Sequence, residues 1–128
     1  MRNLRSYRPA IIAGALLAAG GGSAAAHHGW AWTSPEPFTL TGTVTEIYIG
    51  NPHVTLEVQT EEGLWHVDLA PLIRTTEAGF TQNSVSVGES VTLYGHRSTM
   101  PELAMKAVRV VVNGITYDVY ADRTAPFD

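Results

Sequence analysis

The chain has 128 residues, no cysteine and a formal net charge of −4, with eight Lys and Arg residues against twelve Asp and Glu. This length allows one domain with a single modest core, and the lack of cysteine excludes disulfides and thiolate metal sites. An acidic chain is also a poor candidate for binding nucleic acid, whose phosphates require a basic surface.

The first 26 residues have the layout of a secretory signal peptide. Arg2, Arg5 and Arg8 form a basic start, an apolar run covers residues 10–19, and a tract of small residues ends at Ala26. The apolar run is shorter than the roughly 20 residues that cross a bilayer, so a cleaved leader is favoured over a retained anchor. We expect a periplasmic or secreted protein that has no membrane contact after cleavage. The remaining five basic and twelve acidic residues give a formal charge of −7.

An extended lead-in is expected over residues 27–37, because Pro35 and Pro37 restrict the residues before them and disfavour helix. Its two tryptophans, Trp30 and Trp32, are placed to pack back on the domain that follows.

A long, coiled first strand is predicted over residues 38–50. Apolar residues lie at even positions from Phe38 to Val44 and at odd positions from Ile47 onward. Since side chains alternate between the two faces of a strand, this change requires a bulge or bend, with Gly42 as a plausible pivot.

Turn residues divide the rest of the chain. Asn51-Pro52 ends the first strand, because proline cannot donate to a strand ladder. Strands over 53–59 and 64–69 then form a hairpin about residues 60–63. The later predicted elements are a short helix over 71–78, a fourth strand through Val91 and Leu93, a fifth over 104–112, a sixth over 115–120 after the Asn113-Gly114 turn, and a frayed tail over 122–128.

The order of these elements predicts the fold class. Three strands, a short helix and two or three further strands, with a long coiled first strand, are typical of the OB-fold. We therefore expect a mainly β, OB-like Greek-key barrel of five to six strands over residues 38–121, with one short helix after the third strand. An open sandwich of the same strands is the alternative architecture.

Two histidines would begin the mature chain. A cut after Ala26 makes His27 the amino terminus, where its amine and imidazole can chelate one ion and His28 or His53 can add a nitrogen. A cut after Ala25 instead places His28 third from a free amine. Either start suits copper(II), which tops the divalent affinity order and accepts square-planar nitrogen ligation. The alternative is a polar chain end with incidental affinity.

The other metal candidates are weaker. His53 starts a strand beside a turn, so it is either a ligand or a structural residue whose ring bonds a turn carbonyl. His96 with Met100, or Met100 with Met105, would offer ligands for copper(I). Met105 also fits the core face of its strand.

His66 is expected to have a structural partner. With the hairpin centred between Glu61 and Glu62, His66 faces Glu57 across the ladder, and such pairs stabilise a sheet. The same register places His66 about 13 Å along the strands from His53, too far for the two to bind one ion.

Several short motifs form a set. They are Ala26-His27-His28-Gly29-Trp30, Leu40-Thr41-Gly42-Thr43-Val44, Asn51-Pro52-His53, Trp65, Val87-Gly88-Glu89-Ser90-Val91 and Gly95. The set resembles a family of small exported bacterial proteins, the domain of unknown function 6152, over nearly all of the mature chain. Gly-Trp follows the histidines here, where many relatives have Ser-Phe. The resemblance implies a periplasmic β-barrel domain and supplies no activity.

The sequence predicts an exported, non-enzymatic copper-binding protein. Its proposed ligands are His27, His28 and His53, and no nucleophile triad or glycine-rich phosphate loop is present. The first alternative is a periplasmic interaction module, whose barrel face or Trp30 and Trp32 docks a protein partner or a small ligand. The second is an oligosaccharide or oligonucleotide binder, and the negative charge counts against nucleic acid.

Overall fold

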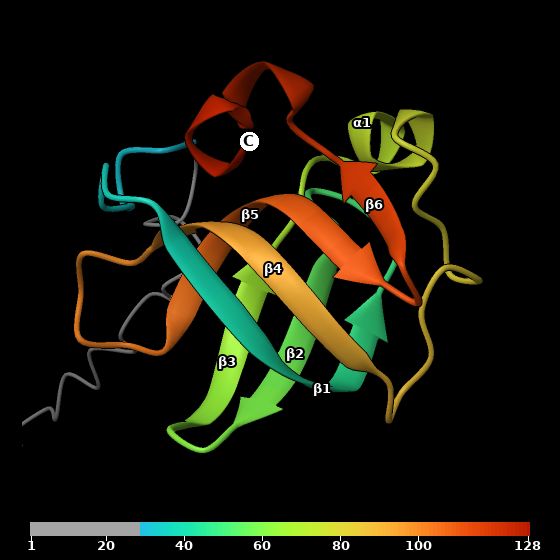
Figure 1. Cartoon of the computed structure of the whole chain (residues 1–128), viewed down its shortest axis with the longest axis horizontal. Helices are drawn as coiled ribbons and strands as arrows, with labels where there is room; N and C mark the ends of the chain where they lie inside the picture. Colours follow the sequence, from blue (N-terminus) through green and yellow to red (C-terminus); the bar gives the residue numbers. More distant parts are fainter. Residues whose placement is uncertain (1–28) are drawn as a thin grey trace, which may run out of the picture.

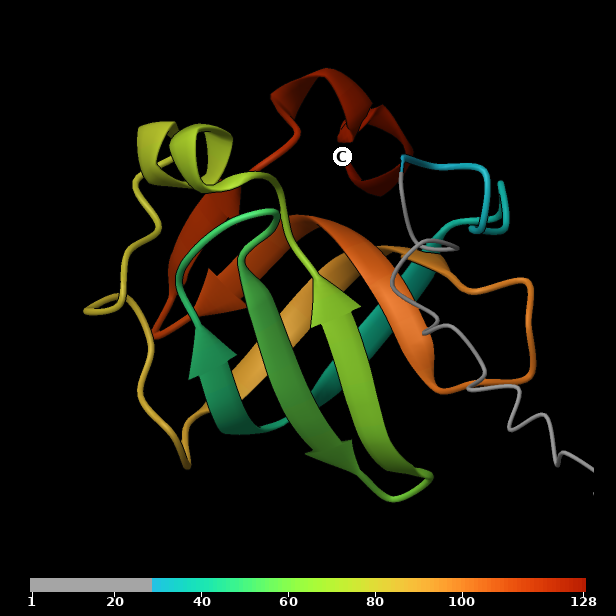
Figure 2. The same cartoon turned by 180° about the vertical axis from the view of Figure 1, so that it is seen from behind.

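The computed structural model describes residues 29–128, which fold into a closed β-barrel of five strands with a sixth strand at its edge (Figures 1 and 2). The elements in chain order are β1 (Phe38–Tyr48), β2 (Thr55–Thr60), β3 (Gly63–Asp68), α1 (Leu72–Glu77), β4 (Ser90–Arg97), β5 (Ala104–Val112), β6 (Ile115–Asp118) and the 3-10 helices η2 (Ala121–Arg123) and η3 (Ala125–Phe127).

The strand pairing identifies the architecture. The sheet order is β3-β2-β1-β4-β5-β6, and the parallel pairing of β3 with β5 closes the barrel, whereas every other neighbouring pair is antiparallel. This arrangement, with α1 between β3 and β4, is that of the OB-fold. The predicted fold class is confirmed.

A bend in β1 lets one strand serve both halves of the barrel. Its first half pairs with β4 and its second half with β2, and the register shifts between Val44 and Glu46, which confirms the predicted bulge. Gly42 is where the backbone of β2 comes closest, since a Cβ there would lie 2.5 Å from the carbonyl oxygen of Gln59. Only glycine permits this approach.

The core follows the alternation of the strands. Trp65 on β3 is fully buried, stacks on Phe38 with ring centroids 5.2 Å apart, and has the guanidinium of Arg97 over its ring at 5.2 Å from the centroid. The other largest fully buried apolar side chains are Val44, Val54, Leu56, Val58, Val67, Leu69, Phe80, Val91, Leu93 and Met105.

Two predicted turns have the expected geometry. Glu57 pairs with His66 across β2 and β3, as the hairpin register requires. Asn113 and Gly114 both have positive φ, 53° and 73°, as a tight turn between twisted strands demands. The corner after β1 contains a cis peptide bond between Asn51 and Pro52.

The short helix α1 begins after Pro71, and the chain turns away at Gly79, whose φ is +89°. Both residues are the start and stop signals that the sequence suggested. No helix within residues 29–128 is long and apolar enough to span a membrane.

The segment after β6 is ordered, so the predicted frayed tail is wrong. The ring of Phe127 packs 5.8 Å from that of Tyr94, and Arg109 on β5 binds the carboxylates of both Asp118 and Asp128 at 2.6 and 2.7 Å. These hydrogen bonds raise the pKa of the Arg109 guanidinium. The prediction failed because the residues that hold this segment come from strands distant in the sequence.

Candidate functional site

The first described residues are fixed to the outside of the barrel. Lys106 on β5 donates a 2.9 Å hydrogen bond from Nζ to the carbonyl oxygen of Gly29, and Nζ lies 4.7 Å from the ring centroid of Trp30. Lys106 is only 2% exposed. Burial lowers the pKa of its ammonium group, and the charge of Asp68 opposes that effect. We call Gly29, Trp30 and Lys106 the lead-in anchor.

Trp30 lies among aromatic and cationic groups from both ends of the domain. Its ring centroid is 5.0 Å from that of Tyr120 and 5.9 Å from that of His96, both in edge-on geometry. The guanidinium carbon of Arg123 lies 4.3 Å from the same ring. Such cation–π contacts contribute about 0.5–1 kcal/mol at exposed sites and more when desolvated.

The next lead-in residues join the end of β4. Thr33 bridges to Ser98, and the amide of Thr99 donates to the carbonyl oxygen of Trp32. Trp32 is 6% exposed. The expectation that the lead-in tryptophans pack back on the barrel is confirmed, and Trp32 is therefore not an exposed docking side chain.

A pocket of about 300 Å³ opens beside this lead-in. We call it the Trp30 pocket. It is lined by Trp30, Thr33, Ser34, Pro35, His96 and Arg123.

The orientation of His96 in this pocket follows from its hydrogen bond. Its Nδ1 lies 3.0 Å from the carbonyl oxygen of Glu36, and a carbonyl can only accept, so Nδ1 carries the hydrogen. In the neutral ring, Nε2 then has the available lone pair.

A second polar cluster lies on the outer face of β2 and β3. His66 contacts carboxylates with both ring nitrogens, Nδ1 at 2.5 Å from Glu57 and Nε2 at 3.0 Å from Asp68. The hydrogen bond with Asp68, and further contributions from Glu57, raise the pKa of His66 to about 9 against the opposing effect of burial. At neutral pH the ring is protonated and donates on both sides, so it has no lone pair for a metal ion or for base catalysis.

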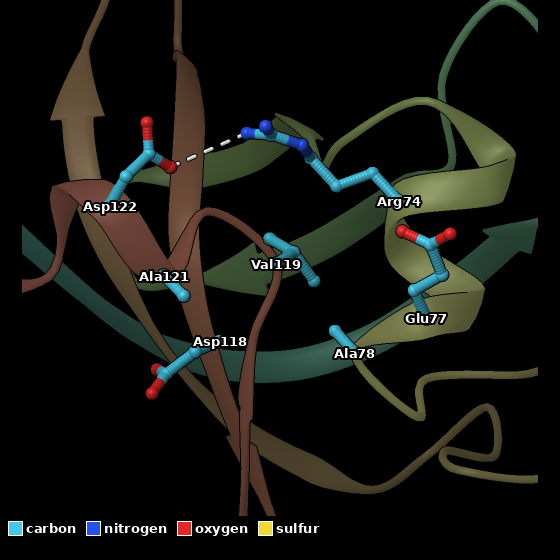
Figure 3. A pocket seen from close by; sticks show the side chains of 7 residues that line it. All are labelled: Arg74, Glu77, Ala78, Asp118, Val119, Ala121 and Asp122. Atoms are coloured by element: carbon cyan, nitrogen blue, oxygen red, sulfur yellow. Dashed lines mark hydrogen bonds and ion pairs between the residues drawn. The ribbon is translucent and has the colours of Figure 1, made fainter.

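A shallow groove separates α1 from the segment after β6 (Figure 3). Its volume is about 600 Å³, and Arg74 reaches across it to Asp122, with 3.4 Å between Nη1 and Oδ1. Its lining residues are Arg74, Glu77, Ala78, Asp118, Val119, Ala121 and Asp122. The ion pair spans the groove and Arg109 binds Asp118, so Glu77 is the one charged lining residue for which the described part of the chain shows no ion pair.

The predicted metal ligands occupy different places. His27 and His28 lie outside the described residues. His53 is half-buried at the corner after the cis peptide, and Met100 is 62% exposed in the loop between β4 and β5. Met105 is fully buried in the core. Among residues 29–128, no three His, Asp or Glu side chains are grouped to hold a metal ion.

Comparison with protein-family models identifies the family of the chain. Residues 15–102 match the family of unknown function DUF6152, which is more than two-thirds of the sequence. The chain belongs to this family. The resemblance expected from the sequence motifs is confirmed. In this DUF6152 chain the match ends before β5, so Lys106 and Arg123 lie beyond the matched segment.

The solved structures similar to the DUF6152 chain are distant. A complex of a ZRD-deleted mutant of TiaS with agmatine is 21% identical, with a TM-score of 0.48, 66% of this chain covered and 26% of that one. The S. pombe Stn1-ten1 complex is 18% identical, with a TM-score of 0.49 and coverage of 59% and 57%. In both, the chain spans less than two-thirds of the other protein. No curated protein matches the sequence.

Sequence reasoning found one part of this site and missed others. The pairing of His66 with Glu57 follows from the hairpin register, and Asp68 stands on the same face as His66 because it is two residues further along the strand. Lys106 had a weaker signal, as the one charged residue among the apolar residues at the start of its strand. Arg123 had none, since its contact with Trp30 depends on how both ends of the domain fold back.

Proposed function

We propose that this protein is exported and holds a copper ion at the start of its mature chain. The ligands are the amine and imidazole of His27, with His28 and His53 as partners. The role is to hold the ion or pass it on, without turnover of a substrate. Such all-nitrogen ligation suits copper(II).

The lead-in anchor is the observation that supports this proposal best. Gly29 is bound by Lys106, and His28 and His27 precede it by one and two residues. Because a residue spans at most about 3.6 Å, the chain cannot carry these histidines far from the barrel. A ligand set restricted in this way loses less entropy when it closes on an ion than one on a free tail.

Electrostatics favour His53 over His96 as the barrel ligand. His96 shares the Trp30 pocket with Arg123, and the positive guanidinium opposes a divalent cation there. Met100, exposed in its loop, is the remaining weaker candidate.

The test is a copper(II) titration of the processed protein, with intact mass recorded to fix the cleavage site. We expect 1:1 binding that is severely weakened by one extra residue before the natural start, and also by His53→Ala. His66→Gln is the matched control, because both nitrogens of His66 already bond carboxylates, and it should leave copper binding unchanged. Weak binding that is indifferent to the extension would refute the proposal.

A further inference from the structure

We propose that the Trp30 pocket binds a small organic carboxylate. This site is separate from the proposed copper site and does not depend on it. The ligand's carboxylate would pair with Arg123, and its apolar body would lie against Trp30 and Pro35.

Arg123 supplies a cation that has no acidic partner within residues 29–128. Of the other arginines within residues 29–128, Arg74 pairs with Asp122 and Arg109 with two carboxylates, and Arg97 lies over the rings of Phe38 and Trp65. The guanidinium of Arg123 instead lies on the ring of Trp30 and lines the pocket. A guanidinium presents parallel N–H donors whose spacing matches the two oxygens of a carboxylate.

The surroundings of Arg123 strengthen its positive field. Lys106 lies on the same indole ring, with Nζ 4.7 Å from the centroid. The nearest carboxylate in the sequence, Asp122, is directed to Arg74 across the groove of Figure 3. In a chain of negative net charge, this is a local site for an anion.

The pocket also offers a hydroxyl donor. Ser34 Oγ accepts a 3.3 Å hydrogen bond from the amide of Glu36, which leaves the hydroxyl hydrogen of Ser34 available. The hydroxyl of Thr33 is already committed, because it donates to the carbonyl oxygen of Trp30 at 2.7 Å. Arg123 and Ser34 can therefore both donate to a bound anion.

The apolar walls select among anions. Ligand sites combine apolar surface with a few placed polar groups, and a volume of about 300 Å³ lies at the small end of their range. The ring of Trp30 and the proline at position 35 provide apolar surface that an inorganic anion would leave unused. A carboxylate with a small aromatic or aliphatic body uses both parts of the pocket.

Benzoate is the probe for this site, and ¹H–¹⁵N NMR of the full processed protein is the measurement. We expect saturable, millimolar binding that shifts the Trp30 indole N–H and the Arg123 side-chain N–H signals. Benzamide, which has the same shape without the charge, should bind much more weakly. Equal binding of benzamide would overturn carboxylate recognition, and equal binding of inorganic phosphate would overturn the preference for an organic acid.

Two substitutions locate the ligand. Arg123→Gln should weaken benzoate binding by about tenfold or more, as expected for loss of a charge-assisted pair. Ser34→Ala should weaken it a few-fold. Arg97→Gln is the matched control, because it removes the same charge at a residue that lies over Phe38 and Trp65 and does not line the Trp30 pocket, and it should leave affinity unchanged. Melting curves establish that each variant is folded. No saturable shift, or equal affinity in Arg123→Gln, would overturn the site.

Discussion

The ammonium group of Lys106 donates to the carbonyl oxygen of Gly29. Strand β5, which closes the barrel, therefore also holds the lead-in segment that precedes β1. In the strand ladder, Lys106 on β5 pairs with Asp68 on β3. The parallel pairing of these two strands completes the barrel. Barrel closure and lead-in docking therefore share one residue.

Substitution of Lys106 should release the lead-in. In Lys106→Met the side chain fills similar space, but Gly29 loses its donor and Trp30 its cation, so we expect about 1–2 kcal/mol less stability. Urea unfolding measures the loss, and amide hydrogen exchange should accelerate over residues 29–33. Thr116→Ala, at an exposed position, serves as the control, and its free energy of unfolding should change by no more than about 0.5 kcal/mol. Unchanged exchange in the lead-in would show that Lys106 does not hold it.

His66 should make stability depend on pH above neutrality. Its pKa is about 9 in the folded chain against an ordinary 6.5, so the stabilisation is complete below pH 6.5 and is lost as the pH rises through 9. The side chain is 40% exposed, and solvent screening reduces the effect to about 1 kcal/mol. The free energy of unfolding should fall between pH 6 and pH 10 in the native chain. That fall should be about 1 kcal/mol larger than the fall in His66→Gln. An identical pH dependence in both would contradict the double carboxylate contact.

Gly95 on β4 should tolerate no side chain. A Cβ there would lie 2.0 Å from the carbonyl oxygen of Lys106 and 2.8 Å from the Cα of Ala107, both backbone atoms that cannot yield without opening the β4–β5 ladder. We expect Gly95→Ala to cost at least about 3 kcal/mol, at or above the usual upper end for overpacking. Ser90→Ala, exposed on the same strand, is the control for denaturant unfolding. A Gly95→Ala chain as stable as this control would refute the close strand approach.

Phe127 should stabilise the barrel although it lies at the end of the sequence. Its ring packs against Tyr94 and His96, with centroids 5.8 and 6.0 Å away. Because the side chain is only partly buried, Phe127→Ala should cost about 1–2 kcal/mol, less than for a core phenylalanine. The ring protons of His96 should also shift in NMR spectra. A tail that was frayed in solution would show neither effect.

The strands were predictable because their signals are local. Alternation located β1, the bulge followed from a change of parity, and the turn at Glu61-Glu62 placed Glu57 opposite His66. The boundaries of β5 were predicted to the residue, since an apolar run ends at the Asn113-Gly114 turn.

The contacts around Trp30 were not predictable from the sequence, because they join residues that are far apart along the chain. They join a residue before the first strand to Lys106 on the fifth strand and Arg123 after the sixth. No spacing rule relates such positions, because their proximity exists only once the barrel has closed. The tail was mispredicted on the same ground, as its partner Arg109 is far from Asp128 in sequence.

The rings of Trp30, His96 and Phe127 are in contact, so both ends of the described chain emerge at one patch of the barrel, opposite the β2–β3 turn (Figures 1 and 2). A short peptide joining these ends, with new termini opened at Glu61-Glu62, would preserve every strand pairing. Because the two ends of the described chain lie close together, a circular permutant is compatible with the same barrel.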